Sequence, residues 1–233
     1  MNLQTYSDLH QVDFFGITIL EPSTVLSSLM MTVVCVIGFC RSFRHRRFRI
    51  ALLTLGFLGF MALATAFGGI LGHGLLYTTG KVGKLPGWIF GIIALAFYER
   101  GVMYRLKDLL DENRLRHLLR LNLAGMGFFL LLTIYFLHFQ VPQYHAIYSL
   151  LILVGSMEIY VYRQIRNRGS IYIFSAIGCA FMAALAHASG VHLSDWFQAN
   201  DVSHIPMAGS IWLLYAGMAN GNFQPVKITS ELR

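Results

Sequence analysis

Residues 50–77 have the sequence IALLTLGFLGFMALATAFGGILGHGLLY, which contains no acidic residue, lysine or arginine. About 20 such residues cross the hydrocarbon core of a bilayer as a helix, and this stretch lacks the polar–apolar alternation of a membrane barrel strand. Six further apolar stretches lie around it, at 23–40, 87–106, 119–138, 145–163, 170–190 and 202–220. The sequence therefore predicts an all-α fold, a bundle of seven transmembrane helices.

The composition is that of a membrane protein rather than a soluble one. Of the 233 residues, 56% are hydrophobic and 12% are charged, whereas soluble domains carry about 25% charged residues. Seven spans consume most of this length and leave only short loops. We therefore expect a single membrane domain, residues 1–233, with a short outer segment at 1–22 and a cytoplasmic tail at 221–233.

The basic residues gather in alternate loops. Five arginines lie in RSFRHRRFR (41–49), and other basic residues lie in 107–118, in 163–168 and in the tail (Lys227 and Arg233). The intervening loops hold only Lys81 and Lys84. Because basic loops stay in the cytoplasm, the pattern predicts an outer N-terminus and a cytoplasmic C-terminus in a plasma or inner membrane. It also explains the net charge of +7, so nucleic acid is not expected as a partner.

Three histidines and one aspartate are expected near the outer ends of three helices. His73 and His187 lie about 23 and 17 residues from the cytoplasmic starts of their helices, and the last helix begins outside with Asp201 and His204. Ionisable groups inside a bilayer are costly and are therefore functional candidates. The alternative is that Asp201, or Asn200 beside it, only caps the last helix and that the histidines are interfacial or core residues.

Imidazole and carboxylate groups on several helices suit zinc. A catalytic zinc has three protein ligands and an open position for water, and it activates that water near neutral pH. We expect His73 and His204 as two ligands, with either His187 or Asp201 as the third. The carboxylate of Asp201, where it is not a ligand, is the expected catalytic base or the group that orients a ligand.

Three glutamates lie in or beside the predicted spans. Glu99 and Glu158 are expected deeper in the bundle, near several arginines, and ion pairing within the bundle is the expected role; a polar pathway or proton relay is the alternative. Glu21 precedes Pro22 at the outer end of the first span. Its carboxylate either points into the outer site or is solvated, and the sequence favours neither.

Two segments resemble motifs of the CREST superfamily, which contains the alkaline ceramidases and the progestin and adipoQ receptors. NDVSHIPMAGSIWLLYAG (200–217) is similar to the last helix of that group, with His204 at the second histidine of its pair, and GGILGHG (68–74) is similar to the second-helix motif, with His73 at its histidine. Asn200 stands at the first histidine of the pair, and Gly69 stands at a serine. The resemblance implies a seven-helix, zinc-dependent hydrolase of a lipid amide or ester.

Other functions fit the same residues. One is a metal- or ligand-binding membrane protein without catalysis, similar to a receptor. Another is a b-type cytochrome with two of the three histidines as axial haem ligands. A retinal protein is disfavoured because span 202–220 contains no lysine, and no pair of interrupted helices points to a transporter.

Overall fold

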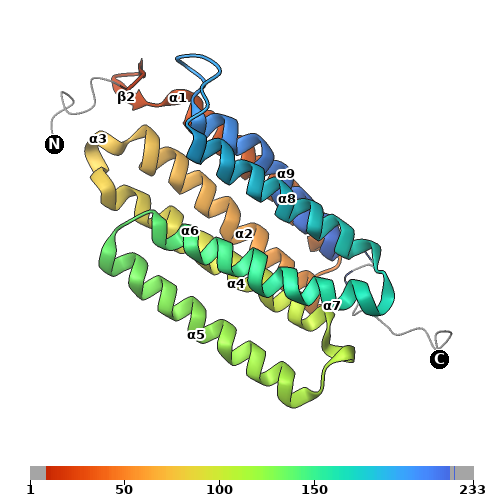
Figure 1. Ribbon diagram of the computed structural model, residues 1–233. Helices are drawn as coiled ribbons and strands as arrows, with labels where there is room; N and C mark the ends of the chain where they lie inside the picture. Colours follow the sequence, from red (N-terminus) through yellow and green to blue (C-terminus); the bar gives the residue numbers. More distant parts are fainter. Residues whose placement is uncertain (1–8, 221–222, 224–233) are drawn as a thin grey trace.

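The computed structural model describes residues 9–220 and residue 223, and these residues form a bundle of long helices (Figure 1). The long helices are α1 (Pro22–Phe43), α2 (Arg49–Gly69), α4 (Leu85–Arg105), α5 (Glu112–Phe136), α8 (Arg168–Ser189) and α9 (Ala199–Ala219). One further rod is built from α6 (Gln140–Ile147), the π-helical η5 (Tyr148–Val154) and α7 (Gly155–Ile165). The short elements are strands β1 (Gln11–Phe14) and β2 (Ile17–Leu20), the π-helical η2 (Ile70–Gly74), α3 (Leu76–Thr79), η3 (Gly80–Lys84) and η4 (Lys107–Leu109).

Six of the described helical segments are long and apolar enough to cross a membrane. Helix α9 is not among them, although it has 21 residues, because the polar side chains of its first turns lower its mean hydropathy. Large apolar side chains are exposed around the bundle, for example Leu26 (68%) and Leu131 (71%), whereas soluble monomers rarely expose extended apolar surface. The prediction of a helical membrane bundle is confirmed, and each of the seven predicted stretches falls on a helical segment.

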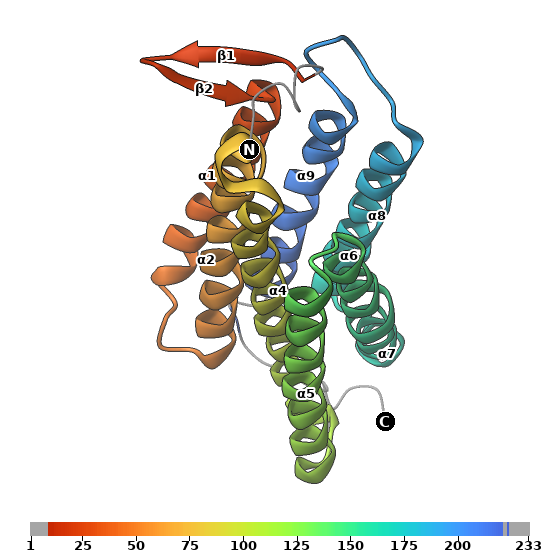
Figure 2. The same ribbon diagram turned by 90° about the vertical axis from the view of Figure 1, so that its left-hand side faces the viewer.

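The bundle is organised around two helices, α2 and α9, each of which packs closely against two others. Helix α2 packs against α1 and α4, while α9 packs against α8 and α1. The Tyr98 hydroxyl of α4 donates to the carbonyl of Leu214 in α9 at 3.3 Å, and Phe57 of α2 contacts the Tyr98 ring edge-on. Helix α5 lies at the margin, against α4 and the α6 end of the rod (Figure 2). The core therefore lies between α1, α2, α4 and α9.

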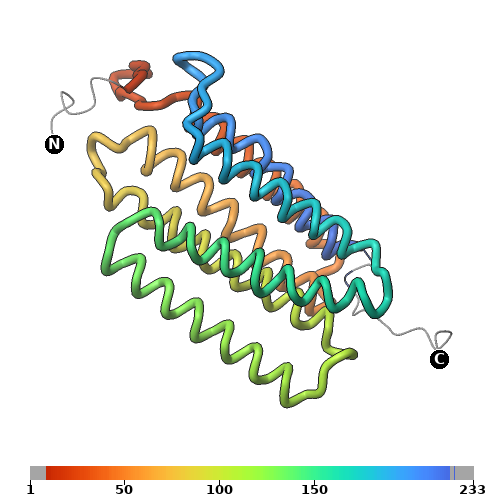
Figure 3. The backbone as a smooth tube through the Cα atoms, viewed as in Figure 1, coloured from red at the N-terminus to blue at the C-terminus, as the bar shows by residue number. Residues whose placement is uncertain are grey.

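The helices alternate in direction, so the connections fall at two ends of the bundle (Figure 3). The arginine end holds the α1–α2, α4–α5 and α7–α8 connections, which are the basic loops of the sequence. The hairpin end holds β1, β2, η2, α3 and the α8–α9 loop. Lys227 and Arg233, which were expected in the cytoplasmic tail, lie outside the described residues.

A β-hairpin precedes the first helix, where the sequence analysis expected only an outer segment in an all-α fold. Strands β1 and β2 pair antiparallel, with Gln11 opposite Leu20. The two turn residues, Phe15 and Gly16, have φ values of 49° and 80°, as in the tight turns that match the twist of a hairpin. The expectation of an all-α fold is corrected in this respect, because two short runs joined by the Phe15–Gly16 turn form a pair of strands beside the helical bundle.

The ion pair expected for Glu158 is present near the arginine end. Arg105 of α4 donates to Glu158 of α7 at 2.5 Å and to Asn167 at 2.7 Å, and the Ser170 hydroxyl donates to the other Glu158 oxygen. Both ionised side chains are almost fully buried. This pair joins α4, α7 and α8. Glu99 has no direct arginine partner among the described residues, because Asn122 lies between it and Arg100.

Candidate metal site at the hairpin end

Glu21 and His73 form the first half of the site. The Nδ1 atom of His73 lies 2.6 Å from Oε2 of Glu21, and both side chains are largely buried. Glu21 is the N-cap residue of α1, with a left-handed backbone at φ 43° and with Pro22 in the first turn behind it. His73 belongs to η2, the π-helical extension of α2. The end of the hairpin and the end of α2 therefore meet through this hydrogen bond.

Glycine at position 69 allows this meeting, because α1 and α2 approach closely there. A Cβ atom on Gly69 would lie 2.7 Å from Cβ of Ser28, and one on Gly74 would lie 3.1 Å from Val25. Gly69 precedes η2 and Gly74 is its last residue, so the turn that carries His73 can lie directly on the first turns of α1. In the resemblance Gly69 stands at a serine; in this chain the hydroxyl beside that position belongs to buried Ser28.

The charge state of Glu21 sets the tautomer of His73. Burial alone raises the pKa of this carboxyl, but the hydrogen bond and charge of His73, with Lys84 and His204 nearby, outweigh burial and lower the pKa below its ordinary value. An ionised carboxylate only accepts hydrogen bonds, so Nδ1 of His73 carries the proton. In neutral imidazole, Nε2 then keeps a free lone pair that can bind a metal ion.

His204, Ser27 and Asp201 form the second half. Oγ of Ser27 lies 2.8 Å from Nδ1 of His204 and donates to Oδ1 of Asp201 at 3.2 Å. With its single proton directed to the carboxylate, Ser27 accepts from Nδ1–H of His204, and Nε2 of His204 again keeps its lone pair. Ser27 is also 3.2 Å from the carbonyl of Thr24. Helix α1 thus fixes one histidine from α2 and one from α9.

Asp201 is fully buried, and both of its oxygens are engaged. Oδ2 accepts from the backbone N–H of Gln198 at 2.8 Å, in a capping box in which Gln198 is the N-cap residue and Asp201 is the third residue of α9. The prediction that Asn200 or Asp201 is itself the N-cap is therefore wrong by two or three positions. Asp201 therefore caps the start of α9 with one oxygen and, with the other, accepts from Ser27, which contacts His204.

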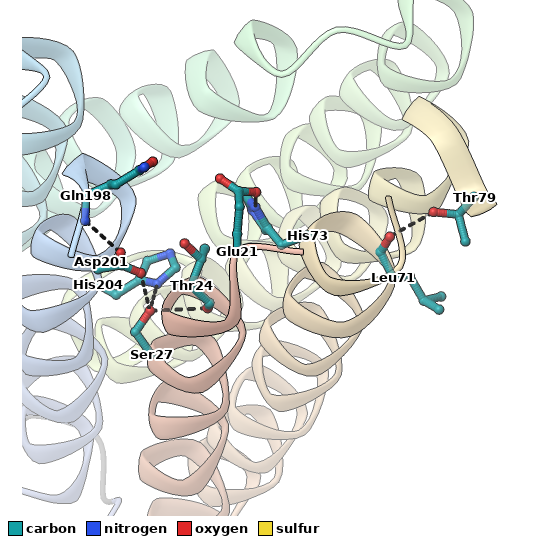
Figure 4. A network of polar contacts seen from close by, with 9 residues as sticks. All are labelled: Glu21, Thr24, Ser27, Leu71, His73, Thr79, Gln198, Asp201 and His204. Atoms are coloured by element: carbon teal, nitrogen blue, oxygen red, sulfur yellow. Dashed lines mark hydrogen bonds and ion pairs between the residues drawn. The ribbon is translucent and has the colours of Figure 1, made fainter. Parts of the chain in front are cut away.

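The two halves lie side by side (Figure 4), with Glu21 and Thr24 of α1 between the two histidines. His204 is close enough to Glu21 to contribute to its lowered pKa. A small pocket opens beside them, lined by His10, Glu21, Ser23, Thr24, Trp196 and Gln198. Above it, the His10 ring stacks on Trp196 of the α8–α9 loop, with ring centroids 4.6 Å apart.

His187 is the expected site residue that the structure does not bring into this hydrogen-bonded group. It is exposed near the end of α8, and its ring meets Phe139 edge-on at 5.7 Å. Within the described ranges, no three side chains of histidine, cysteine, aspartate or glutamate are gathered as a metal-ligand set. The first turns of α1 thus hold two hydrogen-bonded groups, one with His73 and one with His204 and Asp201, and His187 belongs to neither.

Residues 23–222 match a Family of unknown function (DUF6962). The chain belongs to this family. The matched segment contains Ser27, His73, Asp201 and His204 of the DUF6962 protein, and Glu21 lies just before it. No curated protein matches the chain, and no solved structure matches it.

An apolar groove lies at the same end of the bundle as the Glu21–His73 pair. It lies between the hairpin and the ends of α1 and η2, and its lining includes Phe14, Ile17, Ile19, Val25, Ile70 and Leu75. Phe14, Ile17 and Ile70 are also partly exposed at the bundle surface. The groove is thus continuous with the apolar surface of the helices, and its lining includes Gly74, the residue after His73.

Three residues at or beside the site, Ser27, Thr24 and His10, were not predicted from the sequence. Glu21, Thr24 and Ser27 recur every three residues at the start of an otherwise apolar helix, and such spacing places polar groups on one helix face. That signal was available in the sequence. The place of His10 depends on the hairpin, which the sequence analysis did not predict.

Proposed function

We propose that this protein is an integral membrane hydrolase that uses a zinc ion to cleave an amide or ester bond of a membrane lipid. The single observation that carries the proposal is the hydrogen bonding of the two histidines. Nδ1 of His73 is held by Glu21, and Nδ1 of His204 is held by Ser27, whose hydroxyl donates to Asp201. Zinc-binding histidines usually donate their second ring N–H to a carboxylate or another oxygen in this way.

Two of the residues present, His73 and His204, are chemically suited to hold a zinc ion, and a third ligand is proposed. His73 and His204 would hold it through their Nε2 atoms, and His187 is the remaining expected ligand because both Asp201 oxygens are engaged. His187 lies within electrostatic range of His204. When bound, zinc supplies an activated water and polarises a carbonyl group. We assign Asp201 the role of a positioning residue, acting on His204 through Ser27.

The groove supports a lipid as the substrate. It is almost wholly apolar and is open to the surface that we place in the lipid. An acyl chain that enters this groove from the bilayer would exchange contacts with lipid tails for contacts with apolar side chains, so no hydrophobic penalty opposes its entry. Its polar end would then lie beside the Glu21–His73 pair. In this proposal the groove binds the acyl tail, and the histidines face the amide or ester bond that joins the tail to the headgroup.

We further propose that all seven helices cross the membrane with the hairpin end outside and the arginine end in the cytoplasm. Helix α9 has 21 residues, which span about 30 Å at 1.5 Å per residue. The three basic connections lie at the same end of the bundle, as the positive-inside rule requires of cytoplasmic loops. In this orientation the histidines lie near the headgroups of the outer leaflet.

The test is release of fatty acid by zinc-loaded protein from a panel of ceramides, N-acyl amines and lysolipids. We expect release that a chelator abolishes, that His204→Ala abolishes, and that His192→Ala, a change at an exposed histidine of the α8–α9 loop, leaves intact. If no lipid in the panel is cleaved faster by the wild type than by His204→Ala, the hydrolase is wrong, and a binding protein on the same scaffold replaces it.

A further inference from the structure

A second group of buried polar side chains lies away from the hairpin-end site, between α4, α5 and the α6–η5–α7 rod. Glu99 of α4 is 2% exposed, Asn122 of α5 is 3% exposed, and His145 and Ser149 of the rod are 2% and 0% exposed. Asn122 donates from Nδ2 to Oε2 of Glu99 at 2.6 Å. Neither the zinc site nor the lipid groove uses any of these residues.

Three atoms in this group have no hydrogen-bond partner: Oε1 of Glu99, Oγ of Ser149 and Nδ1 of His145. Buried polar atoms are nearly always paired, so each such exception needs an explanation. Ser149 lies beside the Glu99 carboxyl group, and His145 precedes Ser149 by four residues, about one helical turn. One helical turn thus separates His145 from Ser149 on the rod, and Ser149 lies next to Glu99 of α4.

The local backbone is also unusual. Ser149 lies in η5, where the rod becomes π-helical between Tyr148 and Val154. π-Helical turns are rare in proteins, and those that occur are often found at functional sites. The segments on either side, α6 and α7, are regular α-helices. The π-helical geometry is therefore confined to the part of the rod that contains Ser149.

No cationic side chain among the described residues donates a hydrogen bond to Oε1 of Glu99. Arg100 donates from Nε to Oδ1 of Asn122 at 2.6 Å, which turns the Asn122 amide nitrogen toward Glu99. From the rod, His145 is the titratable group on this side, and Arg105 is already paired with Glu158. Helix α2 brings no ionisable side chain except Arg49 at its start, which lies over the Tyr104 ring.

We propose that Glu99, Ser149 and His145 form a proton-binding site, in which a proton enters through His145 and is held on Oε1 of Glu99. Serine and histidine both donate and accept hydrogen bonds, and a carboxylate accepts them and gains one donor when it is protonated. A proton taken up at Nε2 of His145 releases the proton on Nδ1 to Oγ of Ser149, and Ser149 passes its own hydroxyl proton to Glu99. One proton enters and one is held, so the charges balance.

The loaded state pairs all three atoms. Neutral Glu99 donates from Oε1 to Ser149, and Ser149 donates to Nδ1 of His145. Oε2 of Glu99 still accepts from Asn122. The proton also removes a buried charge that no guanidinium group contacts directly among the described residues, and isolated buried charges are costly in a membrane protein. The ligand of this second site is therefore a proton, independent of the metal and of the lipid.

Infrared spectroscopy of the purified full-length protein at neutral pH tests the proposal. A protonated carboxylic acid has a carbonyl stretch that an ionised carboxylate lacks and that shifts in heavy water. We expect this band in the wild type and in Glu112→Gln, a change at an exposed glutamate, and its complete loss in Glu99→Gln. No such band in the wild type, or a band unchanged in Glu99→Gln, would overturn the proposal.

A second pair of variants decides the question if Glu99→Gln does not fold. Ser149→Ala removes the acceptor of the Glu99 proton and should shift the frequency of the band. The control is Ser156→Ala on the same rod, because Ser156 bonds only to carbonyls of its own helix; it should leave the band in place. A band that Ser149→Ala does not move excludes Glu99 as the proton holder.

Discussion

At the scale of single residues, the two histidines at the hairpin end share one arrangement. In each ring one nitrogen is held by an oxygen of α1 or its cap, and the other nitrogen makes no hydrogen bond among the described residues. Glu21 holds His73 directly, while Asp201 acts on His204 through the Ser27 hydroxyl. The orientation of both rings therefore depends on three small contacts, and each contact can be removed separately.

Removing the Ser27 hydroxyl should loosen His204 without touching a metal ligand. In Ser27→Ala the carboxylate of Asp201 and Nδ1 of His204 lose their common partner, so we expect zinc affinity to fall by about 10–100-fold, as for other groups that orient metal ligands. The measurement is competition for zinc with a chelating dye. Ser23→Ala, four residues earlier on the same helix, should keep the wild-type affinity; equal losses in both variants would refute the role of Ser27.

The lowered pKa of Glu21 predicts how pH affects stability. Its ionised form is favoured by the fold, so its contribution is complete above the ordinary value of 4.5 and disappears as pH falls through the lower value in the folded protein. We expect the wild type to unfold at a higher temperature than Glu21→Gln near neutral pH, and the difference to vanish in strong acid. Thermal unfolding in detergent between about pH 3 and 7 measures this. A difference that grows on acidification would contradict it.

At the scale of elements, helices were predictable because each apolar stretch is long enough to decide its own structure. All seven expected stretches are helical, although α5 and the α6–η5–α7 rod start several residues before the expected positions 119 and 145. The hairpin was missed because its two strands have four residues each and depend on the Phe15–Gly16 turn. The π-helical turns were not predictable, since Tyr148–Val154 has the composition of an ordinary apolar helix.

The candidate site was predictable in part for the same reason. His73, His204 and Asp201 were found because ionisable groups are rare in apolar stretches. Ser27 was not found because its role depends on contact between α1 and α9, residues 174 positions apart in sequence. His187 was placed at the right end of the bundle, but the direction of its side chain depends on the packing of α8, which periodicity alone does not give.

The close approach of α1 and η2 gives a prediction at this scale. A methyl group at position 69 would press on Ser28 at 2.7 Å, whereas one at position 68 would meet no atom within 4 Å. We expect Gly69→Ala to destabilise the protein by about 1–3 kcal/mol and to weaken zinc binding by moving His73 away from Glu21. Gly68→Ala is the matched control. Thermal unfolding and zinc affinity of the pair decide the matter, and equal behaviour of the two variants would show that the contact at 69 is unimportant.

At the scale of the whole molecule, alternating helix directions separate a basic end from an end with the hairpin, the groove and the histidines. Positive charge at one end orients the chain in the membrane, and this orientation puts the candidate site at the opposite surface. Because the chain crosses an odd number of times in this account, the side of the membrane that holds the basic end also decides the side that holds the candidate site. An even number of crossings would break that link.

Accessibility of single cysteines tests the orientation. In a background without the native cysteines, a cysteine placed in 41–49, 107–118 or 164–169 should resist an impermeant thiol reagent added outside intact cells. One placed at Thr79 or Gln143, near the hairpin end, should react. Reaction of the arginine-end positions and protection of the other two would reverse the orientation.

The most direct test of the metal site is the metal content of the purified protein, measured together with its absorption spectrum. We predict about one zinc per chain in the wild type and in His192→Ala, no haem band, and loss of zinc in both His73→Ala and His204→Ala. Full zinc occupancy in both of these variants would contradict the site. A haem absorption band that disappears with either histidine would replace it with a cytochrome.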